Sequence, residues 1–392
     1  MSVLQPSRVA IVHDWLDKPG GAERVLQELL KCFPAADLFA VVDMLSEEDR
    51  HLIANKNVKT TFIQRLPGAR KHFRRYLPLM PLAIEQIDLS SYELIISSSW
   101  AVAKGVITGP DQLHVSYVHT PMRYAWDQQH AYLKLEKLDR GLKGIAARLV
   151  LHWLRLWDTR TANGVDVWLA NSANIARRIR KTYGRQAKVI WPPIRIEDFE
   201  LCEKKDDYYF TCSRLVQYKR VDLIIDAFLA RKHRQLIVAG DGPELPALVK
   251  QAGGAANIQF VGRQTDEGIR NYLSKARAFV FAANEDFGIA PIEAQACGTP
   301  VIALGRGGAL ETVRGRGVER PTGYFFDAQT SEAIVSALDG FEALSTPIFP
   351  ADCRENAVSF RSEVFREDIL RTVRAHWAEL QDSKTSAEAS GT

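Results

Sequence analysis

Short apolar runs rich in β-branched residues alternate with longer stretches of helical spacing along most of the chain. Such alternation is typical of βαβ units, in which parallel strands are buried between layers of helices. The pattern therefore predicts an α/β protein with parallel sheets. The predicted strands span residues 8–13, 94–97, 114–119 and 167–170 in the first half and 208–212, 235–239, 258–261, 278–282 and 300–303 in the second.

The Pro192-Pro193 pair divides this pattern, because proline neither continues a helix nor pairs within a central strand. We therefore expect two domains, residues 1–193 and 194–360. A helix at about 361–381 is expected to pack back on the first domain, and residues 383–392 are expected to form a flexible tail. Ligands of such sheets bind beyond the carboxyl ends of the strands, so we expect the substrate in a cleft between the domains.

Large apolar side chains recur at helical spacing within residues 140–157, and basic side chains lie elsewhere on the circumference. This spacing predicts an amphipathic helix. Its apolar members are Leu142, Ile145, Leu149, Trp153 and Leu156, and its basic members include Arg148 and Arg155.

Composition limits the functional classes. The chain has 392 residues, of which 46% are hydrophobic and 25% charged, as expected of folded domains. No apolar run reaches the roughly 20 residues of a membrane span, and the first residues lack a secretory pattern. Five scattered cysteines form no C-x-x-C pair, which favours a reducing cytoplasm. The net charge of +4 is too small to indicate a nucleic acid partner.

Residues 51–84 contain seven Lys or Arg and no Asp or Glu. Aromatic and aliphatic side chains are interleaved with the basic ones, an arrangement that suits anionic lipid headgroups. A solvated, partly disordered loop explains the same composition, and the sequence leaves both interpretations open. The residues concerned are Arg65, Arg70, Lys71, Phe73, Arg74, Arg75, Tyr76, Leu77, Leu79 and Met80.

Gly20 and Gly21 follow the first predicted strand and precede a helical stretch. Backbone N–H groups and the helix dipole meet at such a junction, which suits a phosphate or a developing oxyanion. The segment is neither a P-loop nor a G-x-G-x-x-G fingerprint. A plain tight turn is an equal alternative.

Arg214 and Lys219 lie five residues apart at the carboxyl end of the strand 208–212. Two cations at that position can neutralise a diphosphate leaving group, and such charge stabilisation is often the largest contribution to transfer catalysis. Taken in isolation, the pair is explained more simply as two solvated charges in a loop.

Glu285 and Glu293 lie eight residues apart after the predicted strand 278–282. Gly288 between them allows close approach of the backbone to a ligand, and Pro291 suits the first turn of a helix. Both carboxylates can then accept hydrogen bonds from one elongated ligand, such as the hydroxyls of a sugar and of a ribose. Two ordinary glutamates near a helix terminus are the alternative.

In order along residues 208–326 the chain has S-R-x4-K, A-G-D-G-P-E, F-V-G, E-x7-E, G-T-P-V, a G-G pair followed by glutamate, and T-G-Y. This succession resembles the retaining, GT-B-fold family-4 glycosyltransferases. The first half adds G-G-A-E and V-H-T-P, where the family has a histidine at the end of a strand, here His119. The resemblance covers nearly the whole chain.

The resemblance implies a GT-B fold, that is, two Rossmann-like domains facing a central cleft, the first binding the acceptor and the second the nucleotide-sugar donor. It implies that Arg214 and Lys219 hold the donor diphosphate, and that Glu293 binds the ribose. Glu285 and His119 are the implied catalytic residues, both close to the transferred sugar. The other implied donor contacts are Gly20, Gly21, Val261, Gly262 and the backbone N–H groups of Phe287, Gly288 and Ile289. Without the family, His119 is more simply a structural residue.

The family's chemistry is a front-face displacement in which the leaving phosphate helps to deprotonate the acceptor. That mechanism needs no metal cofactor, and the sequence has neither a D-x-D segment nor a His/Cys cluster. The chain is most similar to the O-antigen and exopolysaccharide mannosyltransferase branch. This implies a hexosyltransferase that moves mannose from GDP-mannose to a lipid-linked oligosaccharide.

A lipid-linked acceptor also implies a cytoplasmic protein bound peripherally to the inner face of the cytoplasmic membrane, with the basic first domain against anionic lipid. The alternatives are a UDP-sugar donor, a GT-B-fold sugar-nucleotide epimerase, and a non-catalytic nucleotide-sugar or lipid binder. A Rossmann dehydrogenase is disfavoured, because no G-x-G-x-x-G follows a predicted strand.

Overall fold

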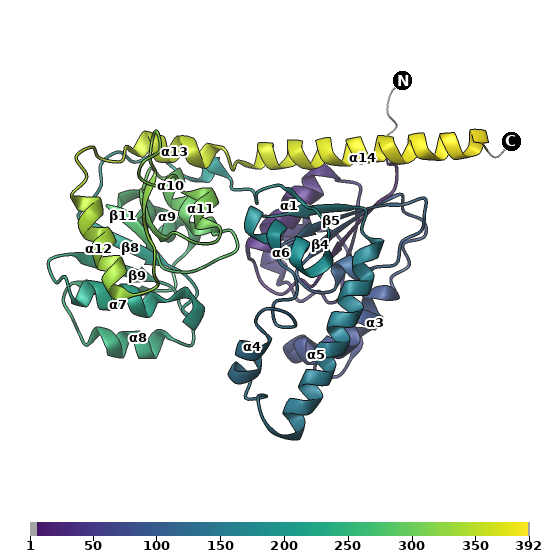
Figure 1. The fold of residues 1–392 in the computed structure, drawn as a ribbon, viewed down its shortest axis with the longest axis horizontal. Coiled ribbons are helices and arrows are strands. Elements are labelled where there is room, and N and C mark those ends of the chain that lie inside the picture. The colour runs from purple at the N-terminus through teal and green to yellow at the C-terminus, as the bar shows by residue number, and fades with distance from the viewer. Residues whose placement is uncertain (1–5, 391–392) are drawn as a thin grey trace. The chain divides into compact units, whose positions relative to one another are not determined.

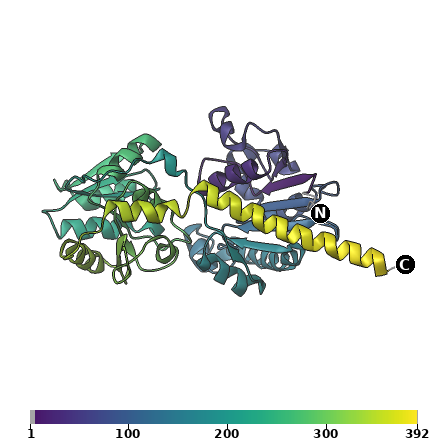
Figure 2. The same ribbon diagram turned by 90° about the horizontal axis from the view of Figure 1, so that it is seen from above.

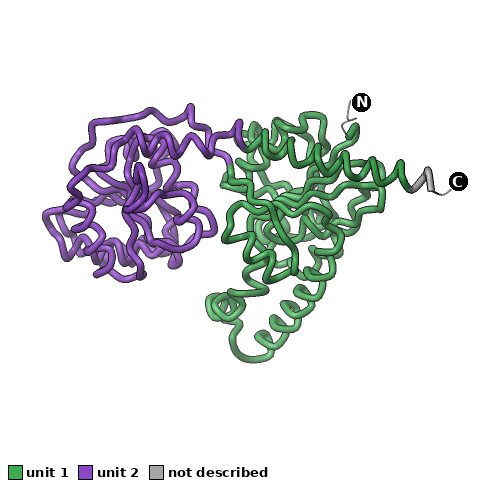
Figure 3. Tube along the Cα trace, turned by 45° about the horizontal axis from the view of Figure 1, so that its top comes forward, with its two compact units in different colours: residues 1–192, 365–392 green, residues 193–364 purple. Residues whose placement is uncertain are grey.

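The structure is a computed structural model, and it describes residues 6–390. The chain forms two compact units, one of residues 1–192 with 365–392 and one of residues 193–364 (Figure 3). The boundary between residues 192 and 193 falls within the proline pair. The two units are called unit 1 and unit 2 below, and each is described by itself.

Unit 1 contains a seven-stranded parallel sheet in the order β3-β2-β1-β4-β5-β6-β7. The chain therefore winds outward from β1 in one direction and then from β4 in the other, so the strand order reverses between β1 and β4. The strands are β1 Val9–His13, β2 Asp37–Ala40, β3 Val58–Thr60, β4 Leu94–Ser99, β5 Leu113–Val118, β6 Val167–Ala170 and β7 Lys188–Val189.

Helices cover both faces of this sheet, because successive strand residues point to opposite faces. Ile11 packs on the side of α1 and α14, whereas Ala10 and Val12 pack on the side of α3 and α5. The helices are α1 Gly21–Cys32, α2 Ala69–His72, α3 Met80–Glu85, α4 Gln129–Leu135, α5 Gly141–Thr161, α6 Ala173–Tyr183 and α14 Ser362–Ser390.

Helix α14 comes from the end of the chain but lies along the sheet of unit 1 (Figures 1 and 2). Phe365, Ile369, Val373 and Trp377 recur at helical spacing and are buried in the same core as Ile11. This is the helix that we predicted at about residues 361–381. It continues through 383–390, where we expected a flexible tail, and residues 391–392 lie outside the described part of the chain.

Unit 2 contains a six-stranded parallel sheet in the order β10-β9-β8-β11-β12-β13, with helices on both faces. Its strands are β8 Tyr208–Cys212, β9 Gln235–Ala239, β10 Ile258–Gly262, β11 Ala278–Phe281, β12 Val301–Leu304 and β13 Gly323–Phe326. Its helices are α7 Val221–Leu229, α8 Leu245–Ala252, α9 Asp266–Lys275, α10 Ile289–Ala296, α11 Ala309–Thr312, α12 Ser331–Glu342 and α13 Pro350–Val358.

The basic segment 51–84 is folded, so the interpretation as a disordered loop is wrong. It contains β3, α2 and part of α3, and Phe73 and Met80 are buried in the core of unit 1. Interleaved apolar residues therefore anchor the segment, while Arg70, Lys71, Arg74 and Arg75 remain exposed. Within the described residues, no helix is both long and apolar enough to cross a bilayer.

Candidate active site

Except for Val261 and Gly262, the predicted donor residues of unit 2 lie where the strand order of its sheet reverses, between β8 and β11. Loops that leave the carboxyl ends of these two strands carry Lys219 and Glu285. Ligands of doubly wound sheets bind at this position, because the two loops diverge there and leave space above the strands. The topology of unit 2 therefore brings the S-R-x4-K and E-x7-E segments together.

Close backbone packing fixes the loop after β8. Gly240 has a φ of 131° and lies so close to Ser213 that a Cβ atom would overlap its carbonyl oxygen. Gly242 lies equally close to Leu215, whose N–H donates to the carbonyl of Asp241 at 2.9 Å. The A-G-D-G-P-E turn thus supports the loop that presents Arg214, which is exposed.

Lys219 forms an ion pair with Glu285. It lies in the short 3-10 helix η7, Gln217–Lys219, and both side chains are largely buried, with 16% and 21% exposed. Burial lowers the pKa of Lys219 to about 8, so the ammonium form, which the adjacent carboxylate favours, predominates at neutral pH. The Lys219 ammonium also lies 5.5 Å from the ring centre of Tyr218.

Gly288 directly precedes α10, and the backbone N–H groups of residues 287–289 lie at the start of this helix. The φ of 86° at Gly288 strongly favours glycine. Among the described residues, none of the N–H groups of Phe287, Gly288 and Ile289 donates a hydrogen bond within the protein. Unpaired N–H groups at a helix start attract an oxygen-rich ligand. Glu293 follows on the same helix and is partly buried.

The Gly307-Gly308 turn supports the Glu285 loop. The N–H of Gly308 donates to the carbonyl of Glu285 at 2.9 Å. A Cβ atom at Gly307 would overlap Glu285, and one at Gly308 would overlap the backbone of Phe287. The glycine pair is part of the family resemblance, but the sequence assigned it no role. In the structure it positions Glu285.

We expect Gly308→Ala to weaken donor binding and to lower the free energy of unfolding by about 1–3 kcal/mol, because the added methyl group must displace Phe287. Calorimetric titration with a nucleotide sugar and thermal unfolding measure the two effects. Gly305→Ala is the matched control, since its Cβ would have a nearest contact of 3.4 Å. Equal donor affinity of both variants would contradict the supporting role.

Val261 and Gly262 end β10, beside the end of β9. The N–H of Gly240 donates to the carbonyl of Gly262 at 2.8 Å, which links the two strand ends. Gly262 has a φ of 66°, so the chain turns sharply here. The structure therefore places this pair on the same edge of the sheet as Lys219 and Glu285, two strands away from β8.

Unit 1 assembles a second polar group at the carboxyl ends of β1, β4 and β5. His119 Nε2 lies 2.8 Å from the hydroxyl of Ser98, which lies 3.0 Å from Nδ1 of His13. His13 Nε2 is 3.8 Å from a carboxylate oxygen of Glu23 on α1. Burial, and secondarily the nearby His13, lower the pKa of His119 to about 3, so His119 is neutral at physiological pH.

Gly20 and Gly21 lie beside this group, at the start of α1. Gly20 is extended, and a Cβ atom there would approach the Glu23 carboxylate to 2.9 Å. Of the predicted residues, unit 1 therefore brings together Gly20, Gly21 and His119. The other nine are all in unit 2, and their roles remain predictions.

Asp14 organises the loop after β4. It is fully buried, and its carboxylate accepts four hydrogen bonds of 2.5–2.8 Å from the successive N–H groups of residues 100–103. Burial raises the pKa of Asp14, whereas three of these N–H groups oppose the rise. Asp14 thereby holds Trp100, whose ring lies 5.5 Å from that of His119.

His13, Asp14, Ser98 and Glu23 were absent from the residues predicted by sequence. A weak signal exists, because a polar pair directly ends the apolar strand β1, and three serines end β4. Only the strand order shows that these ends are adjacent.

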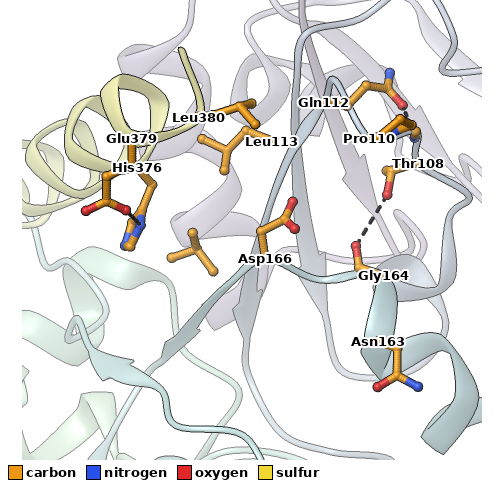
Figure 4. A pocket seen from close by; sticks show the side chains of 12 residues that line it. Thr108, Pro110, Gln112, Leu113, Asn163, Gly164, Asp166, His376, Glu379 and Leu380 are labelled. Carbon is orange, nitrogen blue, oxygen red and sulfur yellow. Dashed lines mark hydrogen bonds and ion pairs between the residues drawn. The ribbon is translucent and has the colours of Figure 1, made fainter. Parts of the chain in front are cut away.

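A cavity of about 530 Å³ lies elsewhere in unit 1 (Figure 4). Its walls include Leu113 and Val167, at the amino ends of β5 and β6, and His376 and Glu379 of α14. His119 follows the carboxyl end of β5, so the cavity is at the opposite edge of the sheet. It contains none of the predicted residues. The described residues also include no cluster of three His, Cys, Asp or Glu suited to a metal ion.

Two sequence families match the chain, one to each half. The model of Glycosyltransferase Family 4 matches residues 19–198, and that of Glycosyl transferases group 1 matches residues 195–360. Together they account for most of the sequence and contain every predicted site residue.

Two curated relatives are similar over shorter segments. A GDP-mannose-dependent monoacylated alpha-(1-6)-phosphatidylinositol monomannoside mannosyltransferase of Corynebacterium glutamicum is 39% identical over 114 residues, which is 26% of this chain and 30% of that protein. A lipopolysaccharide core biosynthesis mannosyltransferase of Rhizobium meliloti is 36% identical over 141 residues, 33% of this chain and 39% of that protein. The chain thus matches about a third of each relative's length.

A solved structure, Anabaena Alr3699/HepE in complex with UDP-glucose, has a similar fold. It superimposes with a TM-score of 0.67 at 18% identity, and the match covers 94% of this chain and 99% of that one.

Proposed function

Because the chain belongs to the GT-B glycosyltransferases that join a Family 4 domain to a group 1 domain, we propose that it transfers mannose from GDP-mannose to a lipid-linked oligosaccharide with retention of configuration. The acceptor is a precursor of a bacterial surface polysaccharide, O-antigen or exopolysaccharide. The observation that carries the proposal is the Lys219–Glu285 pair at the switch point of unit 2, beside the unpaired N–H groups around Gly288.

At the donor, two cations hold the diphosphate and two carboxylates hold the sugars. Arg214 binds as a planar fork and Lys219 as a point charge, which together suit a diphosphate. Glu285 and the N–H groups of residues 287–289 bind the mannose hydroxyls, and Glu293 binds the ribose. Val261 and Gly262 lie against the base, and Gly20 and Gly21 bind the donor from unit 1.

The transfer step breaks the bond between the anomeric carbon and the phosphate oxygen and forms a bond from the acceptor oxygen on the same face of the sugar. The acceptor proton passes to the leaving phosphate, so GDP and the mannosylated acceptor are the products. Lys219 and Arg214 stabilise the negative charge that develops on the diphosphate. These cations provide the charge neutralisation for which other transferases use a metal, so we expect activity without a metal cofactor.

In unit 1 the hydrogen-bonded chain favours one tautomer of His119. The carboxylate of Glu23 favours a proton on the nearby His13 Nε2, so His13 Nδ1 accepts from the Ser98 hydroxyl. The Ser98 oxygen then accepts from His119 Nε2–H. This leaves His119 Nδ1 unprotonated and able to accept a hydrogen bond from a hydroxyl of the donor sugar.

We expect Ser98→Ala to lower kcat/KM about fivefold, because it removes the bond that fixes this tautomer, a contribution of about 1 kcal/mol. Ser97→Ala is the matched control, since its hydroxyl makes a similar bond of 2.9 Å to the buried His114. Steady-state kinetics and thermal unfolding of both variants separate the roles. Equal kinetic losses would mean that Ser98 acts only on stability.

The relatives support mannose as the transferred sugar. Both are mannosyltransferases, the one from Corynebacterium glutamicum depends on GDP-mannose, and the one from Rhizobium meliloti acts in lipopolysaccharide core biosynthesis. The alternative donor is a UDP-sugar, which the UDP-glucose complex of Alr3699/HepE supports. A GT-B-fold epimerase would need acid and base residues arranged for elimination, whereas the E-x7-E and S-R-x4-K segments favour transfer.

The proposed location is the inner face of the cytoplasmic membrane, with peripheral attachment. Arg70, Lys71, Arg74 and Arg75 are exposed on one segment of unit 1, although Arg74 also contacts Asp17 at 2.8 Å. Each basic residue near an anionic surface contributes about 1 kcal/mol to binding. A lipid-linked acceptor requires such proximity.

A screen of nucleotide sugars by thermal unfolding tests the donor. We expect GDP-mannose to stabilise the protein by about 2.7 kcal/mol at a hundredfold excess over its dissociation constant. If UDP-glucose or UDP-N-acetylglucosamine stabilises the protein and GDP-mannose does not, the donor is a UDP-sugar and the assignment of GDP-mannose is wrong.

A further inference from the structure

Helix α5 exposes a row of five large apolar side chains. The predicted amphipathic helix is present, but the apolar residues that defined it are not in the core. Between 43% and 86% of each side chain is exposed to solvent. Single exposed leucines are common on protein surfaces, whereas a continuous row on one helix indicates a binding surface. The residues are Leu142, Ile145, Leu149, Trp153 and Leu156, called the α5 row below.

The opposite side of α5 is fixed in the core of unit 1. Leu151, Leu154 and Trp157 are buried there. Asp158 is fully buried and forms an ion pair of 2.6 Å with Lys104. At about 100° per residue the α5 row lies roughly opposite these side chains. The helix cannot rotate to bury the row without exposing Trp157 and breaking the buried ion pair.

The charges around the α5 row are basic. Within α5 the only acidic residue is Asp158, which is buried, whereas Lys143 and Arg148 are exposed. Arg160 is also exposed and forms an ion pair with Glu85 of α3. Two acidic residues, Glu136 and Asp139, precede the helix. A carboxylate oxygen of Asp139 lies 3.8 Å from Nε of Arg140. An apolar row with basic flanks complements an anionic, apolar partner.

We propose that the α5 row is the surface by which this protein enters an anionic lipid bilayer. Helix α5, roughly 30 Å long, lies in the plane of the membrane. The exposed Leu142, Ile145, Leu149 and Leu156 lie at the level of the acyl chains. Trp153 sits at the headgroup boundary, which tryptophan favours. Helix α4 and the first part of α5 extend beyond the sheet of unit 1 (Figure 1), whereas the end of α5 packs on its core. The row can therefore reach a flat surface without displacing the sheet.

A second copy of the chain is a poorer partner for the α5 row. A two-fold interface would place the same basic residues of two copies near one another with no exposed carboxylate on α5 to pair with them. Anionic headgroups neutralise those charges instead. The choice of a lipid partner rests on the proposed lipid-linked acceptor. The α5 row adds a continuous apolar contact to the exposed Phe62, Leu79 and Leu82 of the basic segment 51–84.

The test compares the full chain with its variant Leu149→Gln/Trp153→Gln in co-flotation with phosphatidylglycerol vesicles and with phosphatidylcholine vesicles. We expect wild type to bind phosphatidylglycerol vesicles and the variant to bind at least tenfold more weakly. Val249→Gln/Val318→Gln is the matched control, because these side chains are similarly exposed but belong to unit 2. The control should bind like wild type.

Equal vesicle binding by wild type and the α5 variant would overturn the proposal. A wild-type dimer without lipid that the α5 variant converts to a monomer would also overturn it, in favour of a second copy. Thermal stabilisation by GDP-mannose should be the same in wild type and variant. Its absence in both, with α5-dependent vesicle binding intact, would reject the proposed donor and retain the membrane surface.

Discussion

Replacement of Lys219 by alanine is expected to lower kcat/KM for sugar transfer about 10²- to 10³-fold, because the leaving diphosphate loses a preorganised cation. The ion pair with Glu285 shows that the ammonium group already points at the position assigned to the donor. Initial rates with GDP-mannose and far-ultraviolet circular dichroism measure activity and folding. Near-normal turnover in a folded Lys219→Ala protein would reject the assignment.

Lys219→Arg is the informative companion, because arginine stays charged at every accessible pH. Burial lowers the pKa of Lys219 from 10.5 to about 8. The wild-type kcat/KM should therefore fall as the pH rises through about 8, and the arginine variant should not show that fall. A parallel decline in both proteins would assign the titration to another group.

The same shift makes stability depend on pH, with a definite sign. The pKa of Lys219 is about 8 in the folded chain and near its usual 10.5 in the unfolded chain. Between these values the unfolded chain binds more protons, so the free energy of unfolding rises with pH. The cost of burying the ammonium is therefore complete below about pH 8 and disappears toward pH 10.5.

Glu285→Gln is expected to lower kcat/KM about 100-fold while keeping the shape of the side chain, because a carboxylate hydrogen bond to a hydroxyl is replaced by a weaker neutral one. The loss of the carboxylate should also lower the pKa of Lys219 further, which moves the alkaline fall in activity to lower pH. Glu267→Gln, an exposed change on α9, is the control. An unchanged pH profile would mean that the two residues are not coupled in the working enzyme.

Much of the fold follows from the sequence because its longer strands are continuous apolar runs between turn signals. The predicted strand 208–212 has the observed bounds of β8, and 235–239 those of β9. The strands that were missed, β2, β3, β7 and β13, have two to four residues, which leaves little pattern to recognise, although the four-residue β6 was predicted. Their places in the sheets depend on long-range pairing.

The site residues that lie within one short segment of the sequence were predicted. Those that depend on contacts between residues far apart in the sequence were missed. Lys219 and Glu285 were predicted from their segments, and the structure adds their contact. Asp14 acts on a loop more than 80 residues away, and Ser98 connects two histidines that are more than 100 residues apart. A pattern within one segment of the sequence cannot predict contacts between residues so far apart.

Helix α5 shows a different limit of sequence patterns. The 3.6-residue period identified the helix and its apolar row correctly, but a period does not tell what covers the row. The core of unit 1 instead contains the less regular set of Leu151, Leu154 and Trp157. The opposite error occurred in residues 51–84. Phe73 was expected on a lipid-binding surface, but it is buried.

The most direct test of retaining mannosyl transfer is a product analysis. The purified chain is incubated with GDP-mannose and a lipid-linked oligosaccharide, released GDP is quantified, and the anomeric configuration of the new linkage is read by nuclear magnetic resonance. We predict one mannose transferred for each GDP released, with the anomeric configuration of the donor preserved. A product of inverted configuration, or transfer from a UDP-sugar with none from GDP-mannose, would contradict this mechanism.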